Sequence, residues 1–236
     1  MIEYSGFNKL DKRIYVSEKM PPALLKPIIA ITDAAKLNVK KFWGDMLSHP
    51  VLIFCRSEEE YNTYGNATGT PAMIHLTPFG SYIIISPDGA NVDVLSHEIC
   101  HAELLKRAGW FIKSAQIPAW FDEGLALRLD ERYPNFKGNS YLNYRMQWIE
   151  STSHGNKSMK LTELEKIDDF YNKDGYWTYI AYLTSGMEVA RWMELVKKEG
   201  LLELIKELKN GKKFMDAYKE IEEKTQKHLI ISQFEN

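Results

Sequence analysis

The sequence predicts an α+β protein, with a small mixed sheet near the N-terminus and mainly helices after it. Runs rich in β-branched and aromatic residues lie in the first third of the 236 residues, whereas apolar residues at helical spacing dominate the rest. Strands in one part of a chain and helices in another are typical of this class. The length fits one domain, in which we expect residues 1–109 to form an α/β lobe and residues 110–236 a helical lobe.

Four short segments carry strand patterns. Residues 1–20 can hold one strand, around the apolar run at residues 13–16. Residues 51–54 follow a proline and have the continuous apolar pattern of a short buried strand. Residues 73–76 and 82–86 flank a Pro-Phe-Gly turn, which predicts that these two strands pair as a hairpin.

Two helices are expected among these strands. Residues 23–48 carry apolar side chains at helical spacing, and Pro27 must lie near the start of that helix because proline disrupts a helix interior. Ser57, followed three residues later by Glu60, matches a capping box, in which each side chain binds the other residue's backbone amide. A helix is therefore expected to begin just after Ser57.

From residue 91 onward the patterns are helical. Asn91 or Asp93 can cap a helix that runs to Gly109, and a second helix is expected from Pro118 to Leu129. Further helices are expected at residues 138–150, 176–199 (ending at Gly200), 201–209 and 213–228, and a short helix or turn at residues 161–170.

The charge balance and the cysteine count exclude several classes of protein. The 30 basic and 32 acidic side chains leave a net charge of −2 with no strongly basic half, so we expect neither nucleic acid nor a membrane surface as a partner. Two cysteines, Cys55 and Cys100, are too few for a disulfide framework. No signal peptide is visible and no apolar run approaches the length of a membrane span, so a cytoplasmic location is expected.

The segment His97-Glu98-Ile99-Cys100-His101 carries the clearest chemical signal. Residues four apart lie on the same face of a helix, so the two imidazoles can reach one zinc ion. Glu98 lies beside that face and can polarise a metal-bound water without binding the metal itself. Alone, the pentapeptide also fits a solvent-facing helix that carries two ordinary histidines.

A carboxylate 22 residues after His101 strengthens the metal hypothesis. Glu123 lies on the next expected helix, where it can complete a His₂Glu set and leave one position for water or substrate. We expect the small residues Gly124 and Ala126 to let this helix approach the histidine helix closely. The alternative is that Asp122 and Glu123 form an acidic first turn, which stabilises a helix N-terminus.

The strings VDVLSHEICHAELLKRAG and IPAWFDEGLALRLDE, within residues 92–131, resemble the gluzincin zinc metallopeptidases. The resemblance is to the peptidase MA-like group, which combines HExxH with a later P-x-W-x-x-E-G-x-A. It implies a single metallopeptidase domain with a thermolysin-like catalytic fold, one Zn²⁺ per chain and hydrolysis of peptide bonds. It also implies that His97, His101 and Glu123 bind the metal and that Glu98 is the catalytic base.

The same resemblance implies a tyrosine that stabilises the oxyanion formed during hydrolysis, on a helix after the third ligand. Tyr176, Tyr179 and Tyr182 lie on the expected helix 176–199. We expect Tyr182 to be the catalytic donor, with Tyr179 as the second choice. The alternative for each is an amphipathic tyrosine that only packs.

Two further roles are expected by analogy with the same enzymes. Their carboxylate four residues after the third ligand is absent, because Leu127 stands there, and Asp122 or Asp93 can substitute as a partner of the ligands. The strand at residues 82–86 can bind substrate backbone as a sheet edge, or it can be a plain core strand.

Two other functions fit part of this pattern. A catalytically silent zinc-bearing module that binds a protein partner would keep the three ligands, but it needs no base at Glu98. A metal-free regulatory or scaffolding protein would need none of these residues. The complete set favours a zinc peptidase whose substrate is a peptide or protein.

Overall fold

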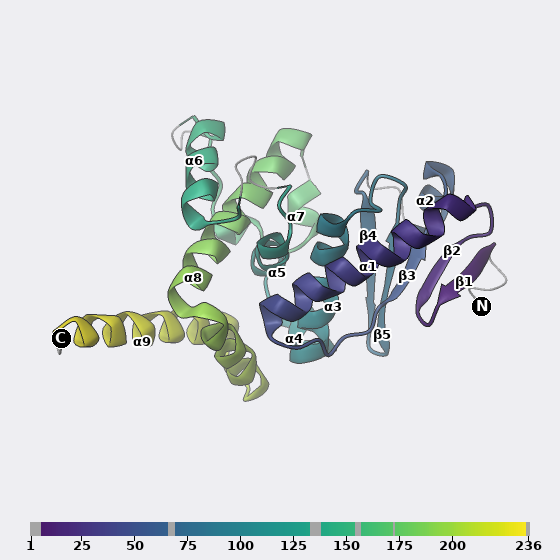
Figure 1. Cartoon of the computed structure of the whole chain (residues 1–236). Helices are drawn as coiled ribbons and strands as arrows, with labels where there is room; N and C mark the ends of the chain where they lie inside the picture. Colours follow the sequence, from purple (N-terminus) through teal and green to yellow (C-terminus); the bar gives the residue numbers. More distant parts are fainter. Residues whose placement is uncertain (1–5, 66–68, 133–137, 154–156, 172, 235–236) are drawn as a thin grey trace. The chain divides into compact units, whose positions relative to one another are not determined.

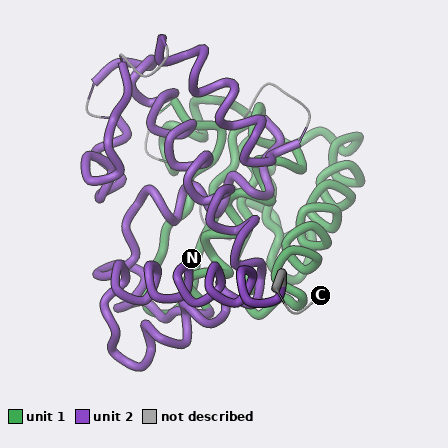
Figure 2. Tube along the Cα trace, turned by 90° about the vertical axis from the view of Figure 1, so that its left-hand side faces the viewer, with its two compact units in different colours: residues 1–106 green, residues 107–236 purple. Residues whose placement is uncertain are grey.

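The computed structural model describes residues 6–65, 69–132, 138–153, 157–171 and 173–234, with only the backbone described at 233 and 234. The protein is a mixed α+β structure, with a five-stranded sheet and a mostly helical remainder (63% helix). The predicted α+β class is therefore confirmed. The chain forms two compact units, residues 1–106 and residues 107–236 (Figure 2). That the whole chain acts as one metallopeptidase domain stays a prediction.

The first unit is built on a mixed sheet with the strand order β1-β2-β3-β5-β4 (Figure 1). Its strands are β1 (Phe7–Asp11), β2 (Ile14–Ser17), β3 (Val51–Phe54), β4 (Ala72–Thr77) and β5 (Gly80–Ile85). The three inner strands β2, β3 and β5 run parallel, and each outer strand is antiparallel to its neighbour.

The predicted strands after residue 50 are confirmed, but the N-terminal prediction was incomplete. β3 has the expected residues, and β4 and β5 form the expected antiparallel hairpin. Before them, two strands form where one was predicted, because β1 pairs with β2. β1 buries only Phe7 fully and exposes Asn8, Lys9 and Asp11, so its sequence shows no apolar run.

β5 is an inner strand, so it cannot serve as the substrate-binding edge. It pairs with β3 on one side and with β4 on the other, and β4 is the outermost strand there. Its residues Ile83 and Ile85 are completely buried. Of the two alternatives for this segment, the core strand is confirmed and the edge strand is wrong.

Three helices accompany the sheet: α1 (Pro22–Trp43), α2 (Glu58–Gly65) and α3 (Val92–Ala108). α1 begins five residues before Pro27, as the sequence required. α1 and α3 lie beside each other (Figure 1), and Asn38 Nδ2 on α1 donates to Ser96 Oγ on α3 at 3.5 Å. Tyr61 of α2 packs on Ile53 and Ile84 of the sheet.

The predicted caps at the starts of α2 and α3 are present. Asn91 Oδ1 accepts from the backbone N–H of Val94 at 3.0 Å, and Ser57 Oγ accepts from that of Glu60 at 3.3 Å. The carboxylate of Glu60 accepts from the backbone N–H of Arg56 at 2.7 Å. Relative to a standard capping box, that reciprocal bond is therefore moved back by one residue.

The second unit consists of helices, and its long helix α8 (Gly175–Lys209) packs against four of the others, α5, α6, α7 and α9. The remaining elements are α4 (Trp110–Ala115), α5 (Ala119–Ala126), the 3₁₀ turn η2 (Leu127–Leu129), α6 (Tyr141–Ser151), the 3₁₀ turn η3 (Leu161–Glu163), α7 (Asp168–Tyr171) and α9 (Phe214–Phe234). Aromatic side chains from α5, α8 and α9 form its core: Trp120, Phe121, Trp192, Phe214 and Tyr218. None of the helices in the described ranges is long and apolar enough to cross a bilayer.

The helix boundaries differ from the prediction in several places. α1 ends at Trp43 rather than at residue 48, and α9 continues to Phe234 rather than ending at residue 228. α4 was not predicted, and it begins directly after Gly109, where the backbone has a φ of 89°. α8 continues through Gly200, and its helical path is instead interrupted at Lys197, with φ 59° and ψ −169°. A Cβ on Gly200 would lie 2.4 Å from the Cβ of Val196. Glycine is therefore needed for this close approach, and it does not end the helix.

Candidate metal centre

His97 and His101 lie one turn apart on α3, as predicted. Both imidazoles are buried, with 5% and 4% of their surface exposed. Their ring centroids are 4.9 Å apart and the ring planes are inclined by 74°. The apolar residues Leu95, Ile99 and Ala102 of the same helix are at most 1% exposed, and their burial sets the rotation of α3 about its axis.

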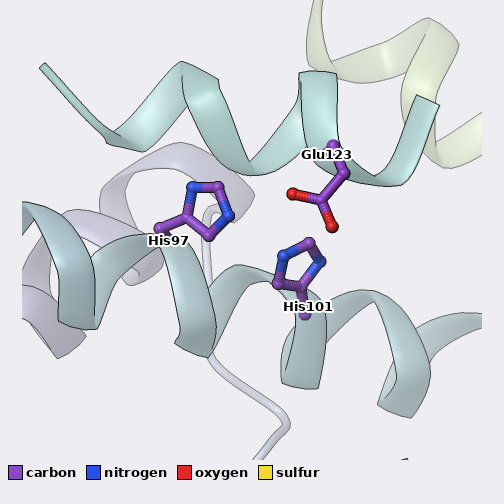
Figure 3. Close-up of side chains that lie close together, drawn as sticks. All are labelled: His97, His101 and Glu123. Carbon is purple, nitrogen blue, oxygen red and sulfur yellow. The ribbon is translucent and has the colours of Figure 1, made fainter. Parts of the chain in front are cut away.

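Glu123 joins the two histidines from α5. Figure 3 shows its carboxylate directed toward the imidazoles. One ligand atom from each of the three residues lies within 4.8 Å of the others, and Glu123 is 7% exposed. The three residues predicted as metal ligands are therefore brought together, and they can hold a metal ion.

The chemistry of the donor set suits a transition metal such as zinc. Two imidazole nitrogens and one carboxylate oxygen form the His₂Glu set of catalytic zinc sites, whereas calcium and magnesium prefer oxygen ligands throughout. A divalent cation also offsets the cost of burying the Glu123 carboxylate. Atoms bound to one zinc ion at tetrahedral angles lie roughly 3.3–3.5 Å apart. The three ligand atoms lie within 4.8 Å of one another, a limit that includes this spacing.

The position of α5 depends on a close approach to α8. A Cβ on Gly124 would lie 2.5 Å from the carbonyl oxygen of Ser185 and 2.6 Å from Val189 Cγ2, both on α8. Gly124 therefore packs against α8. The predicted close approach of this helix to the histidine helix, through Gly124 and Ala126, stays a prediction. Since Gly124 directly follows Glu123, the contact with α8 sets where the third ligand lies.

Backbone and side-chain hydrogen bonds hold both ends of α5. At its start, the amides of Ala119 and Trp120 donate to the carbonyls of Glu165 and Leu164 at 2.9 and 3.0 Å. These bonds satisfy amides that have no partner within the helix. At the other end, the fully buried Tyr144 hydroxyl donates to a backbone carbonyl of the following turn η2, at 3.3 Å.

The residue before Glu123 has a buried partner of its own. Lys113 Nζ on α4 donates to the Asp122 carboxylate, and these side chains are only 8% and 14% exposed. Asp122 was one of two predicted partners for the metal ligands, and the structure places it in this ion pair. Asp93, the other one, lies in the first turn of α3. A role of either carboxylate toward the ligands stays a prediction.

Glu98 follows His97 on α3 and is half-buried, so it is more open to solvent than the three ligands. Its charge acts on Tyr61 of α2, whose hydroxyl lies 3.1 Å from Thr70 Oγ1. Burial is the main cause that raises the pKa of Tyr61, and the negative charge of Glu98 adds to it. The role of Glu98 as a base stays a prediction.

Each of the three candidate tyrosines on α8 has a different hydroxyl partner. The Tyr176 hydroxyl donates to the carbonyl oxygen of Ser151 at 2.7 Å, which uses its only hydrogen. The Tyr179 oxygen accepts from Gln147 Nε2. The Tyr182 hydroxyl lies 2.6 Å from that of another tyrosine, on α7.

The helical geometry of α8 separates the same three tyrosines. Successive residues of an α-helix are rotated by about 100°. Relative to Ser185, which contacts α5, Tyr182 is therefore about 60° away around the axis, Tyr179 about 120° and Tyr176 about 180°. Tyr182 lies closest to the face of α8 that packs on the helix of Glu123.

Sequence reasoning missed a buried carboxylate on the histidine helix. Glu103 is fully buried and accepts hydrogen bonds from the backbone amides of Leu47 and Ser48, at 2.7–3.1 Å. It thereby ties α3 to the segment that follows α1. The available signal was its position four residues after Ile99, on the buried side of the helix, where a charged residue needs hydrogen-bond partners.

Comparisons with protein-family models, with curated proteins and with solved structures give no match for this chain. The structure by itself shows a buried triad able to bind a metal ion, within an α+β fold. Any assignment of an enzyme class therefore rests on the chemistry of this triad and of the residues around it.

Proposed function

We propose that the protein is a zinc-dependent peptidase of the gluzincin type, with a thermolysin-like catalytic domain and a peptide or protein as substrate. The observation that carries this proposal is the convergence of His97, His101 and Glu123 in a buried group. It is supported by Glu98, which lies next to a ligand and is partly open to solvent. A purely structural zinc site needs neither an open position nor an adjacent carboxylate.

Each residue of the site has its own role in hydrolysis. When bound by the triad, zinc supplies a Lewis acid that binds water and polarises the scissile carbonyl. Glu98 takes a proton from the attacking water and passes it to the leaving amine. The Tyr182 hydroxyl donates a hydrogen bond to the oxyanion as it develops. The burial of the ligands limits competing water, which strengthens these electrostatic interactions.

Zinc content and proteolysis test the proposal together. Zinc is measured by elemental analysis in the wild type and in Glu123→Ala, and cleavage of an unstructured protein is measured in the wild type and in Glu98→Gln. Glu131→Gln is the matched control, because Glu131 is exposed and lies outside the triad. We expect one zinc per wild-type chain, much less in Glu123→Ala, and a loss of about 10²–10⁴-fold in cleavage for Glu98→Gln.

The outcomes separate the proposal from its two rivals. Zinc bound at one per chain without cleavage of a broad peptide mixture would favour a catalytically silent module that binds a protein partner. Absence of zinc after reconstitution would contradict the metal site itself. Cleavage that persists at the wild-type rate in Glu98→Gln would remove Glu98 from the mechanism.

A further inference from the structure

The backbone of the long helix α8 is not helical at Lys197. This residue has φ 59° and ψ −169°, a combination that residues other than glycine rarely adopt. Figure 1 shows that α8 changes direction partway along its length. A strained residue of this kind costs free energy and persists only where the surrounding structure enforces it. The contacts on either side of Lys197 therefore have to account for the bend.

Helix α9 holds the half of α8 that comes before this interruption. The Tyr218 ring stacks on the Trp192 ring, with centroids 4.6 Å apart and planes inclined by 14°. The Tyr218 hydroxyl donates to Glu188 Oε1 at 2.8 Å. The Arg191 guanidinium donates to both carboxylate oxygens of Glu222, at 2.6 and 3.0 Å. Bidentate pairs of this kind fix direction as well as distance.

The same helix also holds the half of α8 that comes after the interruption. A Cβ on Gly200 would lie 3.3 Å from Ile221 Cγ2, so α9 packs directly on this glycine. Lys224 Nζ donates to Glu203 Oε1 at 2.8 Å, although these side chains are exposed and their pairing contributes little. α9 thus bridges the interruption, because its residues between Tyr218 and Lys224 contact both halves of α8.

A straight α8 would separate these contacts. Trp192 and Glu207 would then lie about 22 Å apart along the helix. α9 begins beside Glu207, since the backbone N–H of Lys212 donates to the Glu207 carbonyl at 3.1 Å. Tyr218 follows soon afterwards, about 9 Å further along a helix. The bend shortens the remaining separation, so that the Tyr218 ring reaches Trp192.

Aromatic rings of α9 also support the helix that carries the third ligand. Tyr218 meets Trp120 of α5 edge-on, with centroids 5.6 Å apart, and Phe214 meets Phe121 at 5.0 Å. These four side chains are at most 5% exposed. Phe121 and Glu123 lie on the same short helix, so a movement of α9 changes the packing that supports the third ligand.

We propose that α8 is a hinged helix with a bent and a straight form. α9 holds it bent at Lys197, and the bent form is the one in which α5 presents Glu123 to the metal. This role rests on the proposed zinc site. Zinc should in turn favour the bent form, because a ligand that binds one form shifts the population toward it. The hinge thereby couples metal binding to α9, a helix that contributes no residue to the triad.

Two lysine-to-glycine variants test the strain at the hinge. Glycine adopts the backbone angles of Lys197 without a steric penalty, so Lys197→Gly should raise Tm by about 2–6 °C. Lys206→Gly is the matched control, because Lys206 is an exposed residue with helical backbone later in α8. It should lower Tm by about 2–4 °C, since glycine destabilises a helix interior. An unchanged or lower Tm in Lys197→Gly would overturn the strained hinge.

The distance between the two ends of α8 reports its form directly. Nitroxide labels are attached to Gly175→Cys and Lys206→Cys, and a Cβ at Gly175 would find nothing within 4 Å. Both native cysteines are buried and are thus shielded from the label. In a straight helix the two labelled positions lie about 46 Å apart. By pulsed electron paramagnetic resonance we expect a clearly shorter distance in the otherwise wild-type protein, with and without zinc.

The double variant Tyr218→Phe/Glu222→Ala removes the side-chain hydrogen bonds of α9 to the first half of α8 and keeps the aromatic ring. It should raise the ratio of straight to bent form about 100-fold, since hydrogen bonds to charged groups each contribute about tenfold. A second distance of about 46 Å should appear without zinc, and its share should fall with zinc. Glu220→Ala is the matched control on the same helix, because it removes only a pair with Lys212, outside the first half of α8. It should keep the wild-type distance.

The outcomes separate the hinge from the zinc site on which its role rests. A distance of about 46 Å in the wild type would contradict the bend. A single unchanged distance in the double variant would contradict the hold by α9. If zinc binds at one per chain but leaves the share of the straight form unchanged, the coupling to Glu123 is overturned. A chain that binds no zinc contradicts the proposed function and the coupling, whereas the first two comparisons still decide whether α8 is a hinge held by α9.

Discussion

Replacement of Gly124 by alanine tests whether the contact between α5 and α8 sets the third ligand. A Cβ at this position would meet the carbonyl oxygen of Ser185 at 2.5 Å and its carbonyl carbon at 2.9 Å. Since ordinary contact begins at 3.4 Å, the two helices would have to separate by about 0.9 Å. The obstacle is backbone of a buried helix, which cannot rotate away as a side chain can. Glu123 would move with its helix.

The size of the effect follows from two opposing contributions. Overpacking of this kind costs about 1–3 kcal/mol, and backbone contact places Gly124→Ala in the upper part of that range. Alanine in place of glycine favours the helix by about 1 kcal/mol. We therefore expect a net loss of about 1–2 kcal/mol, which lowers Tm by about 2–8 °C for a chain of this size. Displacement of Glu123 should weaken zinc binding about tenfold or more.

Thermal unfolding and zinc titration measure the two effects separately. Gly175→Ala is the control, because a Cβ at Gly175 would find nothing within 4 Å and Gly175 also lies in a helix. It should leave both Tm and zinc affinity near the wild-type values. If Gly124→Ala leaves both Tm and zinc affinity unchanged, the contact between α5 and α8 does not position Glu123.

Three further changes should have measurable effects. Glu103→Leu leaves the backbone amides of Leu47 and Ser48 without their acceptor and should cost about 2–5 kcal/mol in urea unfolding, a loss that Glu103→Gln reduces. Asn91→Ala removes the cap of α3 and should cost about 0.5–2 kcal/mol, while Asn91→Asp keeps most of it, by the same measurement. Burial and nearby carboxylates raise the pKa of the Cys55 thiol from 9.0 to about 12. The folded state therefore favours the neutral thiol, and wild-type stability should fall relative to Cys55→Ala as the pH rises from about 9 toward 12. A difference between the unfolding midpoints of the two proteins that stays constant from about pH 8 to 11 would contradict this.

Secondary structure was predictable where it depends on residues that are close together in the sequence. The β4–β5 hairpin follows from two apolar runs around a turn, and α3 follows from an Asn91 cap with apolar residues at helical spacing. β1 was missed because its stability comes from pairing with β2, which leaves no apolar run in the sequence. The sequence predicted that the helix would end at Gly200, but α8 is interrupted at Lys197 instead. Glycine stands at position 200 because a Cβ there would lie too close to Val196.

The sequence by itself determined the donor set and the helix that presents it. The spacing of His97 and His101 places both imidazoles on one face of a helix whatever surrounds it, because the helix repeat alone sets that geometry. It also singled out Glu123 as the third ligand. Only the tertiary structure decided what holds the helix of Glu123 in place: α8 behind Gly124 and Lys113 beside Asp122. These contacts join residues whose spacing in the chain follows no helix or strand repeat. They arise from the close packing of the folded protein, which a local sequence pattern does not reveal.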